Sequence, residues 1–90
     1  MKEFNKLVLK RRADGFGGKA AKLFYPNGYG VSVITGGGAY CSAEEPYELA
    51  VLKGTEDEWN ITYDTDVTGD VEGYQTAEGI DSLMVQVEAL

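Results

Sequence analysis

The chain has 90 residues, of which 43% are hydrophobic, and it carries a formal net charge of −7 at pH 7. This length predicts one domain over residues 1–90 with a thin core, because so short a chain buries only about 60–65% of its unfolded surface. The chain has no histidine, which excludes a histidine general base and a histidine metal ligand. Its single cysteine, Cys41, excludes an internal disulfide.

Positive charge is concentrated at the N-terminal end. The first 22 residues hold seven of the eight basic residues and two acidic ones, which gives this segment a charge of +5. Residues 23–90 carry −12. A body this acidic attracts basic surfaces and repels nucleic acid, so we expect no direct nucleic-acid partner.

The N-terminal segment is predicted to be a strand followed by a turn. Residues 4–9 alternate loosely between apolar and polar and favour an edge strand that ends in the basic cluster Lys10–Arg12. Residues 15–19 contain the Gly-Lys pair of a phosphate-binding loop but lack its first glycine and its final Ser or Thr, which favours a flexible turn. No apolar run is long enough for the core of a signal peptide or for a membrane span. We therefore expect the protein to lie in a reducing cytoplasm and to have no membrane partner.

The clearest local signal is Asn27-Gly28, which favours a tight hairpin turn because both residues tolerate positive φ. Residues 19–25 and 31–35 flank it as predicted strands. The glycines at 36–38 are expected to break the second strand and to be flexible.

A second hairpin is predicted from residues 47–53 and 59–64, joined by the acidic turn 54–58. In the second segment Trp59, Ile61 and Tyr63 alternate with polar residues, so we expect them to point into the core. In the first segment Glu48 is expected to lie on the opposite face from the apolar residues.

The C-terminus changes to a helical period. Thr76 is the expected N-cap. An apolar stripe at helical spacing follows, made of Ile80, Leu83, Met84, Val87 and Leu90. The predicted fold class is α+β, a twisted antiparallel sheet of four or five strands with a C-terminal amphipathic helix packed on one face.

Residues 64–75 match part of a calcium-binding EF-hand loop, in which alternate side chains converge as oxygen ligands. The candidate ligands are Asp64, Asp66, Thr68, Asp70 and Glu72. The twelfth position is Gln75 where a bidentate Glu is needed, and the preceding segment has a strand pattern. The alternative is a solvated acidic turn, and we expect no metal and no cofactor.

Acidic clusters are the sequence feature that best indicates a function. They comprise Glu44, Glu45 and Glu48, then Glu56, Asp57 and Glu58, and finally the acidic residues of 64–72. Carboxylates along one face can imitate the phosphates of DNA and occupy a basic groove, although such charges also serve solubility alone. Tyr29, Tyr40 and Tyr74 lie near predicted loops and are candidate anchors for a protein partner.

Residues 27–33, 47–54 and 59–65 give the chain a pattern that resembles small acidic proteins of uncharacterised function in bacteriophages and prophages. This class includes anti-CRISPR proteins. The resemblance implies a phage inhibitor in the host bacterial cytoplasm that binds a host nuclease or CRISPR effector stoichiometrically, as a DNA mimic, and blocks recognition or cleavage.

Two alternatives remain open for the function. The first is a phage accessory or assembly module that binds another protein through a sheet edge. The second is a calcium-binding acidic loop protein. An enzyme is not expected, because no pair of carboxylates falls in a recognisable acid–base arrangement.

Overall fold

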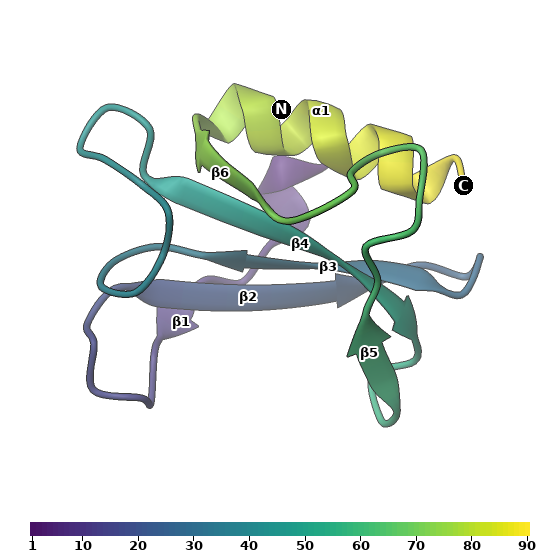
Figure 1. The fold of residues 1–90 in the computed structure, drawn as a ribbon, viewed down its shortest axis with the longest axis horizontal. Helices are drawn as coiled ribbons and strands as arrows, with labels where there is room; N and C mark the ends of the chain where they lie inside the picture. The colour runs from purple at the N-terminus through teal and green to yellow at the C-terminus, as the bar shows by residue number, and fades with distance from the viewer.

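The computed structural model describes residues 1–90, which form one antiparallel sheet with an α-helix across one face (Figure 1). The elements in chain order are the 3-10 helix η1 (Phe4–Lys6), β1 (Lys10–Arg11), β2 (Lys19–Phe24), β3 (Tyr29–Ile34), β4 (Tyr47–Gly54), β5 (Trp59–Ile61), β6 (Glu72–Gln75) and α1 (Ala77–Glu88). The predicted α+β class is therefore confirmed. Neither helix has the length and apolar character that a membrane span requires.

The first five strands form a meander in which each strand pairs antiparallel with the next one along the chain. Both predicted hairpins are confirmed, since β2 pairs with β3 and β4 pairs with β5. In the first turn only Gly28 has positive φ, at 88°, and Asn27 does not. The last strand, β6, pairs with the N-terminal half of β4, whereas β5 pairs with its C-terminal half. β4 is therefore the central strand, with neighbours on both sides.

The sheet face that packs against α1, called here the covered face, holds the core. Its fully buried residues come from β3, β4 and α1 and are Val31, Val33, Leu49, Val51, Ile80, Met84 and Val87. Alternate strand residues and every third or fourth helical residue share a face, which is why these positions meet. The predicted stripe is confirmed except at Leu90, which lies beyond the helix and is exposed.

β4 is buried on both of its faces, which corrects the expectation that Glu48 belongs to an acidic surface cluster that binds a partner. Glu48 is only 9% exposed, and its carboxylate accepts a hydrogen bond from the Tyr40 backbone N–H at 3.0 Å. Ala50 and Leu52, on the same side of β4, are also buried. A strand pattern cannot show that the loop before β4 folds back onto its second face.

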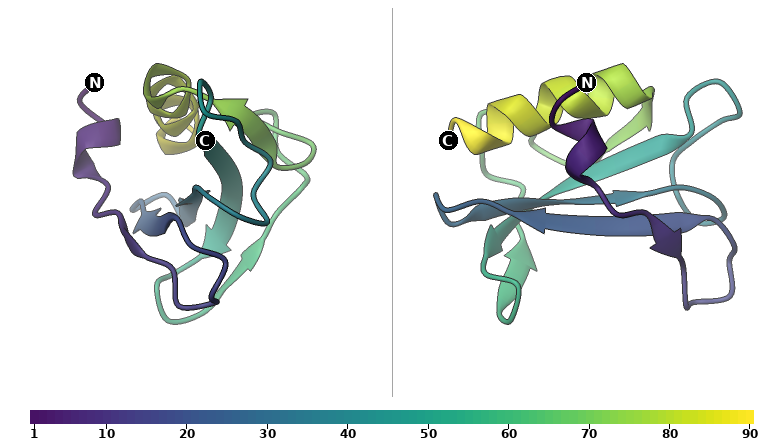
Figure 2. Two further views of the ribbon diagram at one scale, coloured as in Figure 1. Left: turned by 90° about the vertical axis from the view of Figure 1, so that its left-hand side faces the viewer. Right: turned by 180° about the vertical axis from the view of Figure 1, so that it is seen from behind.

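Residues 4–9 do not form the predicted strand, and only Lys10 and Arg11 pair with the sheet. Instead η1 lies beside α1 (Figure 2). The Phe4 backbone N–H donates to Asp81 Oδ1 at 2.7 Å, and the Phe4 ring meets Tyr47 edge to face at 5.2 Å between centroids. Contacts with α1 and β4 therefore determine the conformation of this segment, and its loose alternation of apolar and polar residues does not produce a strand.

The expectation that Trp59, Ile61 and Tyr63 point into the core is wrong. They are 37%, 42% and 54% exposed. Ile61 lies opposite Leu52 and Trp59 opposite Gly54, which places β5 side chains on the sheet face away from α1, called here the open face. The alternation correctly showed that the three share a face, but no second layer covers that face at β5.

Both ends of α1 are capped by side chains. Thr76 is the predicted N-cap, and its hydroxyl accepts a hydrogen bond from the Gly79 N–H at 3.1 Å. At the other end the Asn27 amide group donates to the carbonyls of Val87 and Glu88 at 2.9 and 3.0 Å. The hairpin turn thereby binds the helix C-terminus, whose last carbonyls have no partner within the helix.

The loops at the basic end of the sheet pack on each other rather than lying free. The Arg12 guanidinium binds Asp14 at 2.6 Å and donates to the carbonyls of Thr35 and Gly37. It lowers the pKa of the Asp14 carboxyl by its hydrogen bonds and positive charge. A Cβ on Gly18 would collide with the Thr35 carbonyl, so this close approach requires glycine.

Candidate functional site

Two of the three tyrosines predicted as partner anchors lie side by side in the structure. The Tyr74 N–H donates to the Tyr40 carbonyl at 2.8 Å, and the backbone at Gly73 packs on Tyr40 so closely that no side chain fits there. The side chains remain in solvent, with Tyr40 61% and Tyr74 53% exposed. Two residues 34 positions apart in the sequence thus meet through their backbones, and both side chains are exposed.

Tyr74 has a strained backbone, since it is the only non-glycine residue with positive φ, at 54°. This left-handed conformation costs a side-chain-bearing residue about 1–2 kcal/mol. The hydrogen bond to Tyr40 and the tight packing of Gly73 hold Tyr74 in this conformation. A glycine would adopt this φ without strain, so the backbone conformation does not itself require the tyrosine side chain.

Glu44 and Glu45 belong to the same loop as Tyr40 and are exposed. A turn fixes them, in which the Ser42 N–H donates to the Glu45 carbonyl at 2.9 Å. Neither carboxylate forms an ion pair. Tyr40, Glu44, Glu45 and Tyr74 are called here the tyrosine–glutamate surface.

The acidic turn of Glu56, Asp57 and Glu58 lies at the opposite end of β4 from Glu44 and Glu45 (Figure 1). Thr55 and Glu58 exchange two backbone hydrogen bonds, which makes this a tight hairpin turn with Glu56 and Asp57 at its tip. An eight-residue strand spans about 26 Å. These two predicted clusters therefore cannot meet one small site on a partner together.

Tyr29, the third predicted anchor, is not part of this surface. It lies on the covered face, opposite Lys53, and is partly buried against the core. Lys53 pairs near the C-terminal end of β4, far from Tyr40. We therefore assign Tyr29 to packing.

The five candidate calcium ligands do not converge. No group of three or more acidic, cysteine or histidine side chains is close enough to hold a metal ion. Thr68 is 4% exposed, and its hydroxyl accepts a hydrogen bond from the Asp70 N–H and donates to the Asp70 carbonyl. Glu72 lies in strand β6 and not in the loop, and it pairs with Leu49 of the sheet. Asp64 and Asp66 are exposed.

The protein contains two ion pairs, and both lie in the N-terminal segment. Lys6 binds Glu3 at 2.9 Å, which raises the pKa of Lys6, and Arg12 binds Asp14. The carboxylates after residue 22 form no ion pair. The basic N-terminus therefore does not neutralise the acidic body by direct contact.

The chain matches no protein-family model, and no curated protein or solved structure is significantly similar to it. No family is assigned. Its function is therefore inferred from the surface chemistry of this chain alone.

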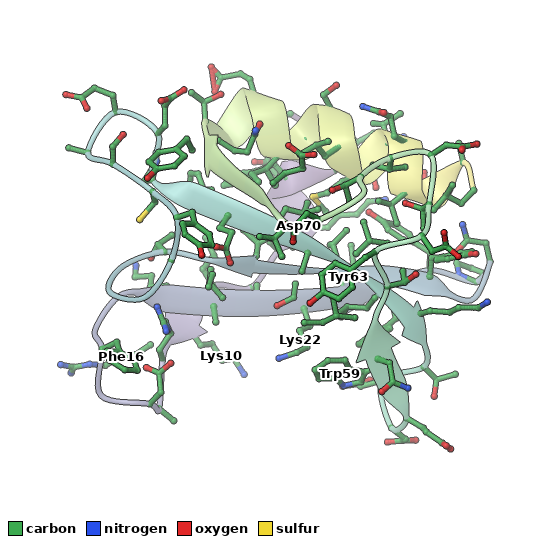
Figure 3. The ribbon with its side chains drawn as sticks, in the orientation of Figure 1. Lys10, Phe16, Lys22, Trp59, Tyr63 and Asp70 are labelled. Atoms are coloured by element: carbon green, nitrogen blue, oxygen red, sulfur yellow. The ribbon has the colours of Figure 1, made fainter.

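The sequence interpretation missed a contact between the basic N-terminal segment and β5. Lys22 Nζ lies 5.2 Å from the centroid of the Trp59 ring, on the open face (Figure 3). The register of the first hairpin indicates the face on which Lys22 lies, because it pairs Lys22 with Ser32 and places both on the face away from Val31. Nothing in the sequence indicated that β5 would reach this face.

Proposed function

We propose that the protein is a non-enzymatic inhibitor that binds a basic nucleic-acid-binding effector of a bacterial host, of the kind that anti-CRISPR proteins block. The binding site is the tyrosine–glutamate surface. Its carboxylates face the basic site of the effector and its tyrosine rings pack against the rim, so that the effector loses access to nucleic acid.

The single observation that carries this proposal is the strained, exposed Tyr74 held beside exposed Tyr40. Tyrosine contributes large contact area with little loss of conformational freedom, which is why it is enriched among residues that dominate binding energy. Two such rings fixed by backbone contacts form a preorganised contact site.

Charge supports a basic partner. Glu44 and Glu45 belong to the same loop as Tyr40 and bind no cation of the chain, and residues 23–90 carry −12. Complementary charge accelerates association and makes it sensitive to salt. Binding should therefore weaken as the ionic strength rises.

Affinity capture from a lysate of bacteria with an active CRISPR system tests the proposal. Tagged wild-type protein is compared with three variants, Tyr74→Gly, Glu44→Lys and Glu88→Lys, and the retained proteins are quantified by mass spectrometry. Glu88 is exposed on α1, away from the surface, and is the matched control for charge reversal.

We expect subunits of a nucleic-acid-binding effector to be retained by the wild type and by Glu88→Lys. We expect the other two variants to bind them about 10-fold or more weakly. Retention of virion proteins instead would favour the accessory or assembly module. Equal retention by all four proteins would reject the tyrosine–glutamate surface.

A further inference from the structure

The open face carries a row of exposed apolar side chains that no element of the chain covers. Trp59, Ile61 and Tyr63 lie at alternate positions along β5 and its continuation, where the Thr62 N–H still pairs with the Val51 carbonyl at 2.9 Å. A monomeric protein rarely leaves contiguous large apolar side chains in solvent, and such patches mark interaction sites.

Two lysines lie next to this apolar row. Lys10 and Lys22 project from β1 and β2 on the side away from α1, and Lys22 reaches the Trp59 ring (Figure 3). Together with Val8 and Ala20 they line an open pocket of about 300 Å³. Neither lysine forms an ion pair, so the β1–β2 side of the open face is positively charged.

The acidic turn 56–58 borders the same face on its other side. It directly precedes Trp59 and extends away from α1 at the tip of the β4–β5 hairpin (Figure 1). Its carboxylates are exposed and form no ion pair. The open face therefore has a basic side, an apolar middle and an acidic tip.

We propose that the open face binds a second copy of this chain in a two-fold symmetric dimer. A two-fold axis through the apolar row places the acidic tip of each copy on Lys10 and Lys22 of the other, and Ile61 and Trp59 near the axis. Such an interface is self-complementary, because each contact occurs twice.

The area that a stable dimer would need to bury is a small part of the protein surface. A stable interface buries about 800 Å² on each partner, which is about 15% of the 5427 Å² of this protein. Nucleic acid fits less well, because the acidic tip beside Trp59 repels phosphates and two lysines neutralise few of them. The tyrosine–glutamate surface lies at the other end of β4 and stays free in the dimer.

Sedimentation equilibrium over micromolar to millimolar protein tests this dimer. We expect the average mass to rise from 9.8 kDa toward twice that value, and the dissociation constant to increase with salt. Trp59 is the only tryptophan, so its fluorescence should shift to shorter wavelength over the same concentration range.

Charge reversal on each side separates this arrangement from other dimers. The double variants Lys10→Glu/Lys22→Glu and Glu56→Lys/Glu58→Lys should each dimerise about 10-fold or more weakly, because like charges then face each other. An equimolar mixture of the two should dimerise again, while Glu88→Lys should behave as the wild type. Circular dichroism confirms that each variant is folded.

Three results would overturn the proposal. The first is a monomer at every concentration, and the second is a dimer that the reversals do not weaken. The third is an equimolar mixture that does not associate. A monomer that binds a single-stranded oligothymidylate through Trp59 would assign the open face to nucleic acid instead.

Discussion

The two faces of the sheet differ in what their apolar residues do. On the covered face, Val31, Val51 and their neighbours are at most 1% exposed and pack against α1. On the open face, Trp59, Ile61 and Tyr63 are 37–54% exposed although they are equally apolar. Since apolar area removed from water provides most of the stabilisation of a fold, the buried residues of the covered face should contribute much more stability than the exposed row on β5.

The same division applies to the tyrosines. Tyr25 and Tyr47 pack in or against the core, whereas Tyr40 and Tyr74 are exposed next to each other. The first two tyrosines are buried or packed, whereas the other two are exposed and one of them, Tyr74, has a strained backbone. We therefore expect the two pairs to have different roles. The variants below separate these roles.

The largest effect is expected for Leu49→Ala on the covered face. Leu49 is fully buried, so its truncation leaves a cavity and should lower the free energy of unfolding by about 3 kcal/mol. Ile61→Ala on the open face should lower it by less than about 1 kcal/mol. Urea denaturation at micromolar protein measures both, and equal losses would contradict the division between the faces.

Asn27→Asp tests the contact between the hairpin turn and the helix. The introduced carboxylate still accepts from the Tyr29 N–H, but it loses the amide donor that binds the Val87 and Glu88 carbonyls and sets like charge against the helix C-terminus. We expect a loss of about 2 kcal/mol in unfolding free energy at pH 7. The loss should shrink at a pH below the pKa of the introduced carboxyl group, where that group is neutral. The exposed Asn60→Asp is the control and should change stability by less than about 0.5 kcal/mol.

Tyr25→Phe has a pH-dependent effect. Burial raises the pKa of the Tyr25 hydroxyl, with a further contribution from the nearby Glu3 carboxylate, although no acceptor lies at normal hydrogen-bond geometry. At pH 7 the variant should differ from wild type by less than about 1 kcal/mol. Above pH 10 the unfolded wild type releases this proton and the folded form keeps it, so wild-type stability falls with rising pH.

Chemical denaturation between pH 9 and 11.5 measures this difference. The wild type should lose up to about 1.4 kcal/mol per pH unit through Tyr25, and Tyr25→Phe should lack that contribution. Parallel curves for the two proteins would show that the hydroxyl is hydrated in the folded state.

Tyr74→Gly should have the smallest effect on stability. Glycine removes the strain of the positive φ but adds conformational freedom to the unfolded chain, so the unfolding free energy should change by less than about 1 kcal/mol. Partner binding should nevertheless fall. A large loss of stability would instead show that Tyr74 packs as part of the fold.

Much of this fold follows from local sequence chemistry. Asn27-Gly28, the alternation of residues 47–53 and 59–64 and the stripe from Ile80 to Val87 predicted both hairpins and the helix with its Thr76 cap. These features depend on turn geometry and side-chain periodicity, which short segments determine.

The rest depended on contacts between distant segments. Periodicity shows which side chains share a face but not which face is covered, so Trp59 was placed inside and Glu48 outside. The adjacency of Tyr40 and Tyr74 follows from the pairing of β6 with β4, and no local pattern predicts that pairing. The strain at Tyr74 is likewise visible only in the backbone.

The most direct test of the proposed function is a titration of the captured effector. Its nuclease activity is measured against increasing amounts of purified protein at effector concentrations well above the dissociation constant. A stoichiometric inhibitor predicts a linear loss of activity that ends at a fixed ratio of protein to effector, and a smaller loss at that ratio with Tyr74→Gly. Inactivation by far smaller amounts that progresses with time would contradict it, as would full inhibition by the variant.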